Sequence, residues 1–154
     1  MVQHRDNSAI LIRLAYILGN LTTNFEEARV KLCKKKASEK SCFITITELA
    51  CFYLEKDAKG GAAAGGEKAA KNSKYQEFTT GHLEDALTKI IKLLANSSIE
   101  ESVAYEEFHQ MQDQLNKFLE QLCHAVNRRT IEENEEFVLN AVSCITNILY
   151  YDTA

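Results

Sequence analysis

The chain of 154 residues contains no proline and no tryptophan, and it has only six glycines. Proline is the strongest helix breaker, so its absence permits long helices throughout the sequence. No apolar run approaches the roughly 20 residues that a membrane-spanning helix needs. We therefore expect an all-α protein that has no membrane segment and no membrane partner.

An excess of positive charge is also absent, because the formal net charge is −4. A nucleic-acid-binding protein usually presents a basic face, so the overall balance argues against a nucleic-acid partner. The five cysteines are an odd number and form no Cys-x-x-Cys pair. The polar residues at the start carry no secretory leader. These features predict reduced thiols in a cytoplasmic protein.

Motifs that carry catalysis or ligate metals are missing as well. No sequence typical of a nucleophilic cysteine surrounds any of the five, although four histidines are present. Cys42 and Cys51 are nine positions apart, which places them on opposite faces of one helix. The glycine pairs at 60–61 and 65–66 follow no strand and precede no Lys-Ser/Thr, so they predict no phosphate loop. We expect no cofactor, no metal, no small-molecule substrate and no enzymatic activity.

What the sequence does contain is a helical period in its apolar residues. Helices are predicted at residues 8–22, 24–36, 39–56, 79–97, 100–110 and 111–128, and from Thr130 to about Tyr150. The segment Cys42–Thr47 is β-branched and resembles a strand, but the spacing of Phe43, Ile46 and Ala50 favours a helix. The predicted inward faces are Leu11, Leu14, Leu18 and Leu21; Leu83, Leu87, Ile90 and Leu94; Leu115, Leu119, Leu122 and Val126; and Val138, Val142, Ile145 and Leu149.

Residues 57–74 differ from the rest, since they hold four of the six glycines and no large apolar residue. Such a segment cannot bury enough surface to offset the entropy of ordering. We expect a flexible insertion there, inside a single domain that spans 1–154. The first helix has no helices before it to pack against, so we also expect the chain to be part of a longer array. Because one end of its repeats should expose apolar surface, we expect the chain alone to self-associate.

Three segments of the chain are alike: residues 11–21, 83–96 and 137–149 are apolar helices that end in or near a hydrophobic residue, a small residue and an asparagine. A short helix, two longer ones and an asparagine near the end of the third resemble the armadillo repeat family. The resemblance implies a right-handed superhelix of about two to three stacked repeats that binds proteins. Asn20 and Asn96 are 76 residues apart and Asn96 and Asn147 are 51 apart, so short insertions into a unit of about 40–47 residues are expected.

The same three segments, with the low-complexity insertion, also resemble a ciliary member of that family. This resemblance implies a cytoplasmic adapter in motile cilia and sperm flagella, which helps radial spokes to reach and dock in the axoneme and travels with the intraflagellar transport machinery. One alternative is a generic armadillo or HEAT-type interaction module of another cytoplasmic complex. An enzyme, or a regulatory domain of one, is a further and disfavoured alternative.

Asn20, Asn96 and Asn147 are the first candidates for partner contact. The resemblance implies a groove in which such asparagines hold the backbone of an extended ligand through the amide. The alternative is that each asparagine closes the end of its helix. Peptide-binding armadillo proteins place a tryptophan one turn earlier, where this chain has Tyr16, Lys92 and Ser143. Only Tyr16 is aromatic, so an interface other than the import-signal type is favoured.

Charged clusters are the second candidates. The basic residues Lys34, Lys35 and Lys36 stand together with Arg29, Lys31 and Lys40. They could bind an acidic partner such as a tubulin tail or an import receptor, or they could be a solvated helix end. The acidic residues Glu132, Glu133, Glu135 and Glu136 could bind a basic partner, or they could stand at a helix N-terminus because the helix dipole favours them there.

Overall fold

The computed structural model describes residues 7–33, 41–63, 80–101, 108 and 111–152. Its helices are α1 (Ser8–Asn24), α2 (Glu26–Cys33), α3 (Cys42–Ala63), α4 (Thr80–Ser97), α6 (Gln112–Asn127) and α7 (Ile131–Asp152). Within these ranges no strand occurs, which confirms the all-α prediction. None of the described helices is both long and apolar enough to cross a membrane.

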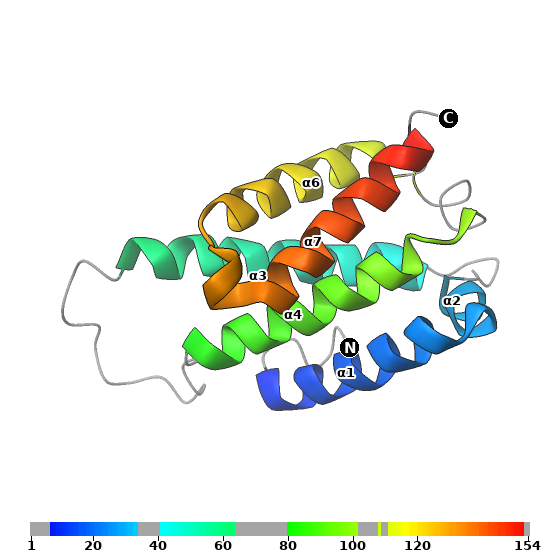
Figure 1. Ribbon diagram of the computed structural model, residues 1–154, viewed down its shortest axis with the longest axis horizontal. Coiled ribbons are helices and arrows are strands. Elements are labelled where there is room, and N and C mark those ends of the chain that lie inside the picture. The colour runs from blue at the N-terminus through cyan, green and yellow to red at the C-terminus, as the bar shows by residue number, and fades with distance from the viewer. Residues whose placement is uncertain (1–6, 34–40, 64–79, 102–107, 109–110, 153–154) are drawn as a thin grey trace.

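The helices pack in two layers with an armadillo-like arrangement (Figure 1). Helices α1, α4 and α7 lie side by side and run in the same direction, and α4 contacts both of the others. Helices α3 and α6 pack against each other and run in the opposite direction, with α3 behind α4. The short helix α2 lies across the end of α1. The order of a short helix followed by two long ones is therefore present in α2, α3 and α4.

Local sequence accounts for two helix starts. Asn7 caps α1, because its side-chain oxygen accepts a hydrogen bond of 3.2 Å from the backbone nitrogen of Ile10. The β-branched start of α3 is helical, which confirms the choice against a strand. There Thr45 and Thr47 donate hydroxyl hydrogen bonds of 2.9 Å to the carbonyls of Ser41 and Phe43, four residues earlier. These bonds satisfy polar side chains that would otherwise compete with the helix.

The core lies between the two layers and includes most of the predicted inward residues. Leu87, Ile90 and Leu94 of α4 are fully buried, as are Leu11 of α1 and Leu122 of α6. The predicted face of α1 is wrong in part. Leu21 is 46% exposed, and the residues that α1 buries besides Leu11 are the small ones Ala15, Gly19 and Thr22.

The predicted face of α7 is also wrong in part, because Val142 is 49% exposed and Leu149 is 46% exposed. The fully or almost fully buried residues are Phe137, Ala141, Cys144 and Ile148. Apolar residues surround most of this helix, so periodicity alone could not choose its inward face. In addition, Asn134 leaves helical geometry at φ −145° and ψ 47°, which kinks α7 after its first turn.

Residues 57–63 of the predicted insertion at 57–74 are not a flexible segment, because α3 continues through Asp57 to Ala63. Residues 64–74 lie outside the described residues. Asp57 also has a structural role that the composition of this segment did not show. Its carboxylate accepts hydrogen bonds of 2.7 Å from both Arg128 Nη2 and Arg129 Nη2 at the end of α6.

Arg129 connects most of the long helices. Its guanidinium bonds Asp57 of α3, its Nε lies 3.4 Å from Glu84 of α4, and its Nη1 donates to the carbonyl of Ala125 in α6. The guanidinium carbon also lies 4.5 Å from the ring centre of Phe137 in α7. The Arg129 side chain is only 8% exposed, so these contacts form in a poorly solvated corner.

Replacing Asp57 by asparagine tests this corner. Burial acts to raise the pKa of Asp57, but the hydrogen bonds and charges of Arg129 and Arg128 outweigh it and hold the pKa below its ordinary value. The stabilisation is therefore complete above the unfolded pKa of about 4 and is lost as the pH falls through the folded value. We expect Asp57→Asn to lower the free energy of unfolding by about 1–3 kcal/mol at neutral pH.

Urea unfolding at neutral pH and at about pH 3 measures this difference, which should shrink in acid because, below the unfolded pKa of about 4, the unfolded chain binds a proton at Asp57 and the native ion pair opposes that protonation. The exposed Asp85 of α4 provides a matched control, and Asp85→Asn should change stability by no more than about 0.5 kcal/mol. A deficit of Asp57→Asn that is equally large in acid would contradict the role of the charge.

Candidate interaction surface

The candidate asparagines lie near the ends of the parallel helices α1, α4 and α7. Asn96 of α4 points its amide nitrogen at α1, where it donates a hydrogen bond of 2.9 Å to the backbone carbonyl of Gly19. The same nitrogen donates to the hydroxyl of Thr23 at 2.8 Å and lies 3.4 Å from that of Thr22. The amide donor of Asn96 therefore connects two neighbouring helices of one layer.

Asn147 of α7 repeats this contact one helix further on. Its amide nitrogen donates a hydrogen bond of 3.0 Å to the carbonyl of Ala95 and lies 3.4 Å from the hydroxyl of Ser98. The hydroxyl of Tyr151 donates a further bond of 2.7 Å to the carbonyl of Ile99. In both contacts the acceptor is the carbonyl of the residue immediately before the asparagine of the preceding helix.

Asn20 of α1 has no such partner within the described residues, and its side chain is half-buried. Tyr16, one turn earlier, is 54% exposed. The three asparagines are thus equivalent in sequence but not in their contacts, because the amide donors of two are used inside the fold. Their role in holding a ligand stays a prediction.

A sequence signal for these contacts exists, but it lies in the residues beside each asparagine rather than in the asparagine itself. A small residue precedes the asparagine and hydroxyl residues follow it in Gly19-Asn20-Leu21-Thr22-Thr23 and in Ala95-Asn96-Ser97-Ser98. The small residue lets a neighbouring helix approach, and the hydroxyls accept from the incoming amide. This pattern indicates an acceptor for the next helix rather than a ligand groove.

The members of the basic cluster differ in their surroundings. Arg29 is used internally, since its Nη1 donates a hydrogen bond of 2.9 Å to the carbonyl of Thr22 and its Nε pairs with Glu100 after α4. Lys31 is exposed near the end of α2. Lys34, Lys35 and Lys36 lie outside the described residues, so a role in binding an acidic partner stays a prediction for them.

The members of the acidic cluster at the start of α7 differ in the same way. Glu136 reaches back to α4, where Lys89 Nζ lies 2.7 Å and 2.9 Å from its two carboxylate oxygens. Lys92 Nζ lies 3.9 Å from the same carboxylate. Glu133 accepts a hydrogen bond of 2.9 Å from the hydroxyl of Thr130, a side-chain contact with the spacing of the predicted capping box. Glu132 and Glu135 are exposed.

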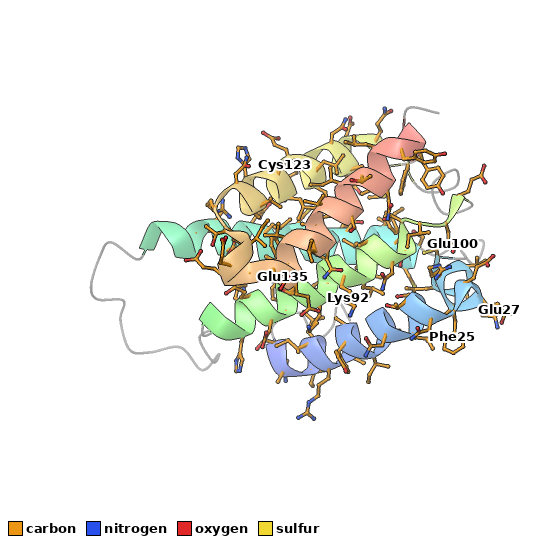
Figure 2. All side chains as sticks on the ribbon, in the orientation of Figure 1. Phe25, Glu27, Lys92, Glu100, Cys123 and Glu135 are labelled. Carbon is orange, nitrogen blue, oxygen red and sulfur yellow. The ribbon has the colours of Figure 1, made fainter. Side chains whose placement is uncertain are left out.

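The five cysteines form no disulfide among the described residues, and burial keeps two of their thiols protonated. Burial raises the pKa of Cys144 to about 12 and the pKa of Cys51 to about 11. Because only the thiolate is a good nucleophile, these two side chains are unreactive at neutral pH. Cys123 is exposed on α6 (Figure 2). Among the described side chains, no three of His, Cys, Asp or Glu gather closely enough to hold a metal ion.

A groove of about 490 Å³ lies between α1 and α2. Its walls are mainly apolar, and Phe25, at the junction of the two helices, is 58% exposed (Figure 2). Two charged residues of α2, Glu27 and Lys31, also line the groove. The lining residues are Leu18, Leu21, Thr22, Phe25, Glu27, Ala28, Lys31 and Leu32. We call this site the α1–α2 groove.

These features define an all-α helical stack of the armadillo-like kind, in which asparagine contacts join the parallel helices α1, α4 and α7. Comparison with known proteins agrees with that class. The chain is similar to two proteins named Armadillo repeat-containing protein 2, with 26% identity to the protein of Bos taurus and 23% identity to that of Mus musculus. Each match extends over 149 residues and covers 97% of this chain.

The chain spans only 16% and 15% of the length of these two relatives. No protein-family model matches the sequence. No solved structure matches it either. The comparisons therefore support the armadillo-like repeat architecture and extend along almost the whole of this chain.

Replacing Asn96 by aspartate separates a helix-joining role from a ligand role. Aspartate has nearly the same shape but offers a carboxylate where the carbonyl of Gly19 needs a donor. We expect Asn96→Asp to lower the free energy of unfolding by about 1–3 kcal/mol. Asn20→Asp, the matched control on α1, should change it by no more than about 0.5 kcal/mol in dilute solution. Equal stability of the two variants would show that the contact to Gly19 contributes nothing.

Proposed function

We propose that this chain is a non-enzymatic protein-interaction scaffold, and that it serves as an adapter for radial spokes in motile cilia and flagella. The finer role rests on the resemblance of the three asparagine-containing segments to a ciliary armadillo protein. Two relatives named Armadillo repeat-containing protein 2 match 97% of the chain, which supports the armadillo-type scaffold. The partners we propose are components of radial spokes or of intraflagellar transport.

The observation that carries the scaffold proposal is the distribution of exposed apolar side chains. Within the described residues, every large hydrophobic residue that is exposed, except Ile99, lies on α1, on its C-cap Phe25 or on α7. On the central helix α4 no large apolar residue is exposed: Leu83 is partly buried, and the others, Leu87, Ile90, Ile91, Leu93 and Leu94, are fully buried. Apolar surface gathered at the two edges of a stack is typical of sites that bind other proteins.

The α1–α2 groove is the surface that we propose for the partner. Its apolar walls suit a nonpolar side chain of a protein segment, and Phe25 supplies an exposed aromatic ring of the kind that dominates binding energy at interfaces. Exposed Lys31, with Lys34, Lys35 and Lys36 next in sequence, favours acidic residues flanking that segment. Among the described residues, the α1–α2 groove thus combines apolar walls with one positive charge, Lys31, and one negative charge, Glu27.

Affinity purification of the chain from ciliated cells tests this function. The wild-type chain should recover radial-spoke or intraflagellar transport components, and Phe25→Glu should lose them because it places a charge in the apolar groove. Ile131→Glu adds the same charge at an equally exposed residue far from the groove, and it should retain them. Recovery of an unrelated cytoplasmic complex by the wild type would favour a generic armadillo or HEAT-type module and contradict the ciliary role.

A further inference from the structure

The contacts between parallel helices follow a common register, set by Asn20, Asn96 and Asn147. In α4, the positions in register with Leu139, Val142 and Thr146 of α7 are Thr88, Ile91 and Ala95. In α1 they are Ile12, Ala15 and Gly19. The positions in α4 are buried to 8% exposure or less, and Ala15 and Gly19 are buried as well. This face of α4 lies against α7, and the corresponding face of α1 lies against α4.

In α7 the residues at the same register positions are exposed to solvent. Leu139 is 55% exposed, Val142 is 49% exposed and Thr146 is exposed. We call these three residues the α7 stripe. The stripe has no charged member, and its neighbour Ser143 is also neutral. It stands at the same positions as the surfaces that receive a further parallel helix elsewhere in the fold, with Thr146 in the place of the small residues Gly19 and Ala95.

The opposite edge of the stack has the complementary surface. On α1, Tyr16, Ile17, Asn20 and Leu21 form what we call the α1 outer face. Ile17 is 60% exposed, whereas Leu93 and Cys144, which stand in register with it on α4 and α7, are fully buried. Asn20 also stands where Asn96 and Asn147 donate to the preceding helix, and within the described residues its amide has no acceptor.

We propose that a second copy of this chain docks the α1 outer face on the α7 stripe, head to tail. The contact extends the row α1, α4, α7 by the α1 of the next copy, in the register that the fold already uses twice. Asn20 Nδ2 of one copy then donates to the carbonyl of Thr146 of the other, as Asn147 donates to that of Ala95. Tyr16 and Ile17 cover Val142 and Leu139.

A second copy is the occupant that the surfaces favour, because both halves of the contact are present on one chain and continue an interface that exists inside it. The two surfaces are different, so the contact is heterologous and each copy keeps one free end. Assembly should therefore grow with concentration rather than stop at a dimer. Leu21 belongs to both the α1 outer face and the α1–α2 groove, whereas Tyr16, Ile17 and Asn20 do not line the groove, so variants at these three residues test this inference separately.

Sedimentation velocity of the full chain tests the proposal. The wild type should exceed the monomer mass of 17.4 kDa increasingly as concentration rises. Val142→Glu blocks the α7 stripe and Ile17→Glu blocks the α1 outer face, so each variant alone should stay a monomer. Asn20→Asp should weaken association by about tenfold or more, because it removes the donor to the Thr146 carbonyl. Ile131→Glu, on α7 before the kink at Asn134, should associate like the wild type.

Mixing the two blocked variants gives the decisive result. Val142→Glu retains an intact α1 outer face and Ile17→Glu retains an intact α7 stripe, so the mixture should form a one-to-one heterodimer and nothing larger. A heterodimer also proves that both variants are folded. A wild type that stays monomeric at high concentration would overturn the proposal, and so would a mixture that fails to pair. Continued self-association of either single variant would instead indicate a symmetric contact and would overturn it as well.

Discussion

The structure depends on the close approach of three parallel helices, α1, α4 and α7, through faces that contain small residues. Ala15 and Gly19 on α1, and Ala95 on α4, let the next helix come near enough for an asparagine amide to reach a backbone carbonyl. Each of these carbonyls also accepts a hydroxyl hydrogen bond from its own chain segment, from Thr23 at 2.8 Å for Gly19 and from Ser98 at 3.0 Å for Ala95, so amide, hydroxyl and carbonyl form one small network. Because donor and acceptor are both near the helix ends, the contact sets the axial register of each pair.

Charged contacts hold the second layer in place relative to the first. Asp57 of α3 meets Arg128 and Arg129 beyond α6, and Arg129 also reaches Glu84 of α4. A guanidinium that is 8% exposed is costly to bury unless its donors are used, so the corner selects one arrangement of helices over others. The asparagine contacts order the helices within a layer, and Arg129 orders one layer against the other.

Helix type and order were predictable from the sequence because apolar periodicity is long and clear, even where Cys42–Thr47 looked like a strand. The inward face of α7 was not predictable, since apolar residues surround it and the kink at Asn134 changes its direction. The role of Asp57 was hidden by the glycine-rich composition around it, because its partners are more than 70 residues away. The amide contacts needed a spatial neighbour that no local pattern specifies.

The asparagines also show that the same sequence motif can make different contacts at different places in a helical stack. The same residue type at the same helix position donates to a neighbouring helix in α4 and α7, yet it has no acceptor in α1 within the described residues. The difference is one of place among the described helices, because α4 and α7 each lie beside an earlier helix of the row and α1 is the first helix described. The amide and the large apolar side chains of the middle helix α4 are used largely inside the fold, whereas α1 and α7 each expose several large apolar side chains.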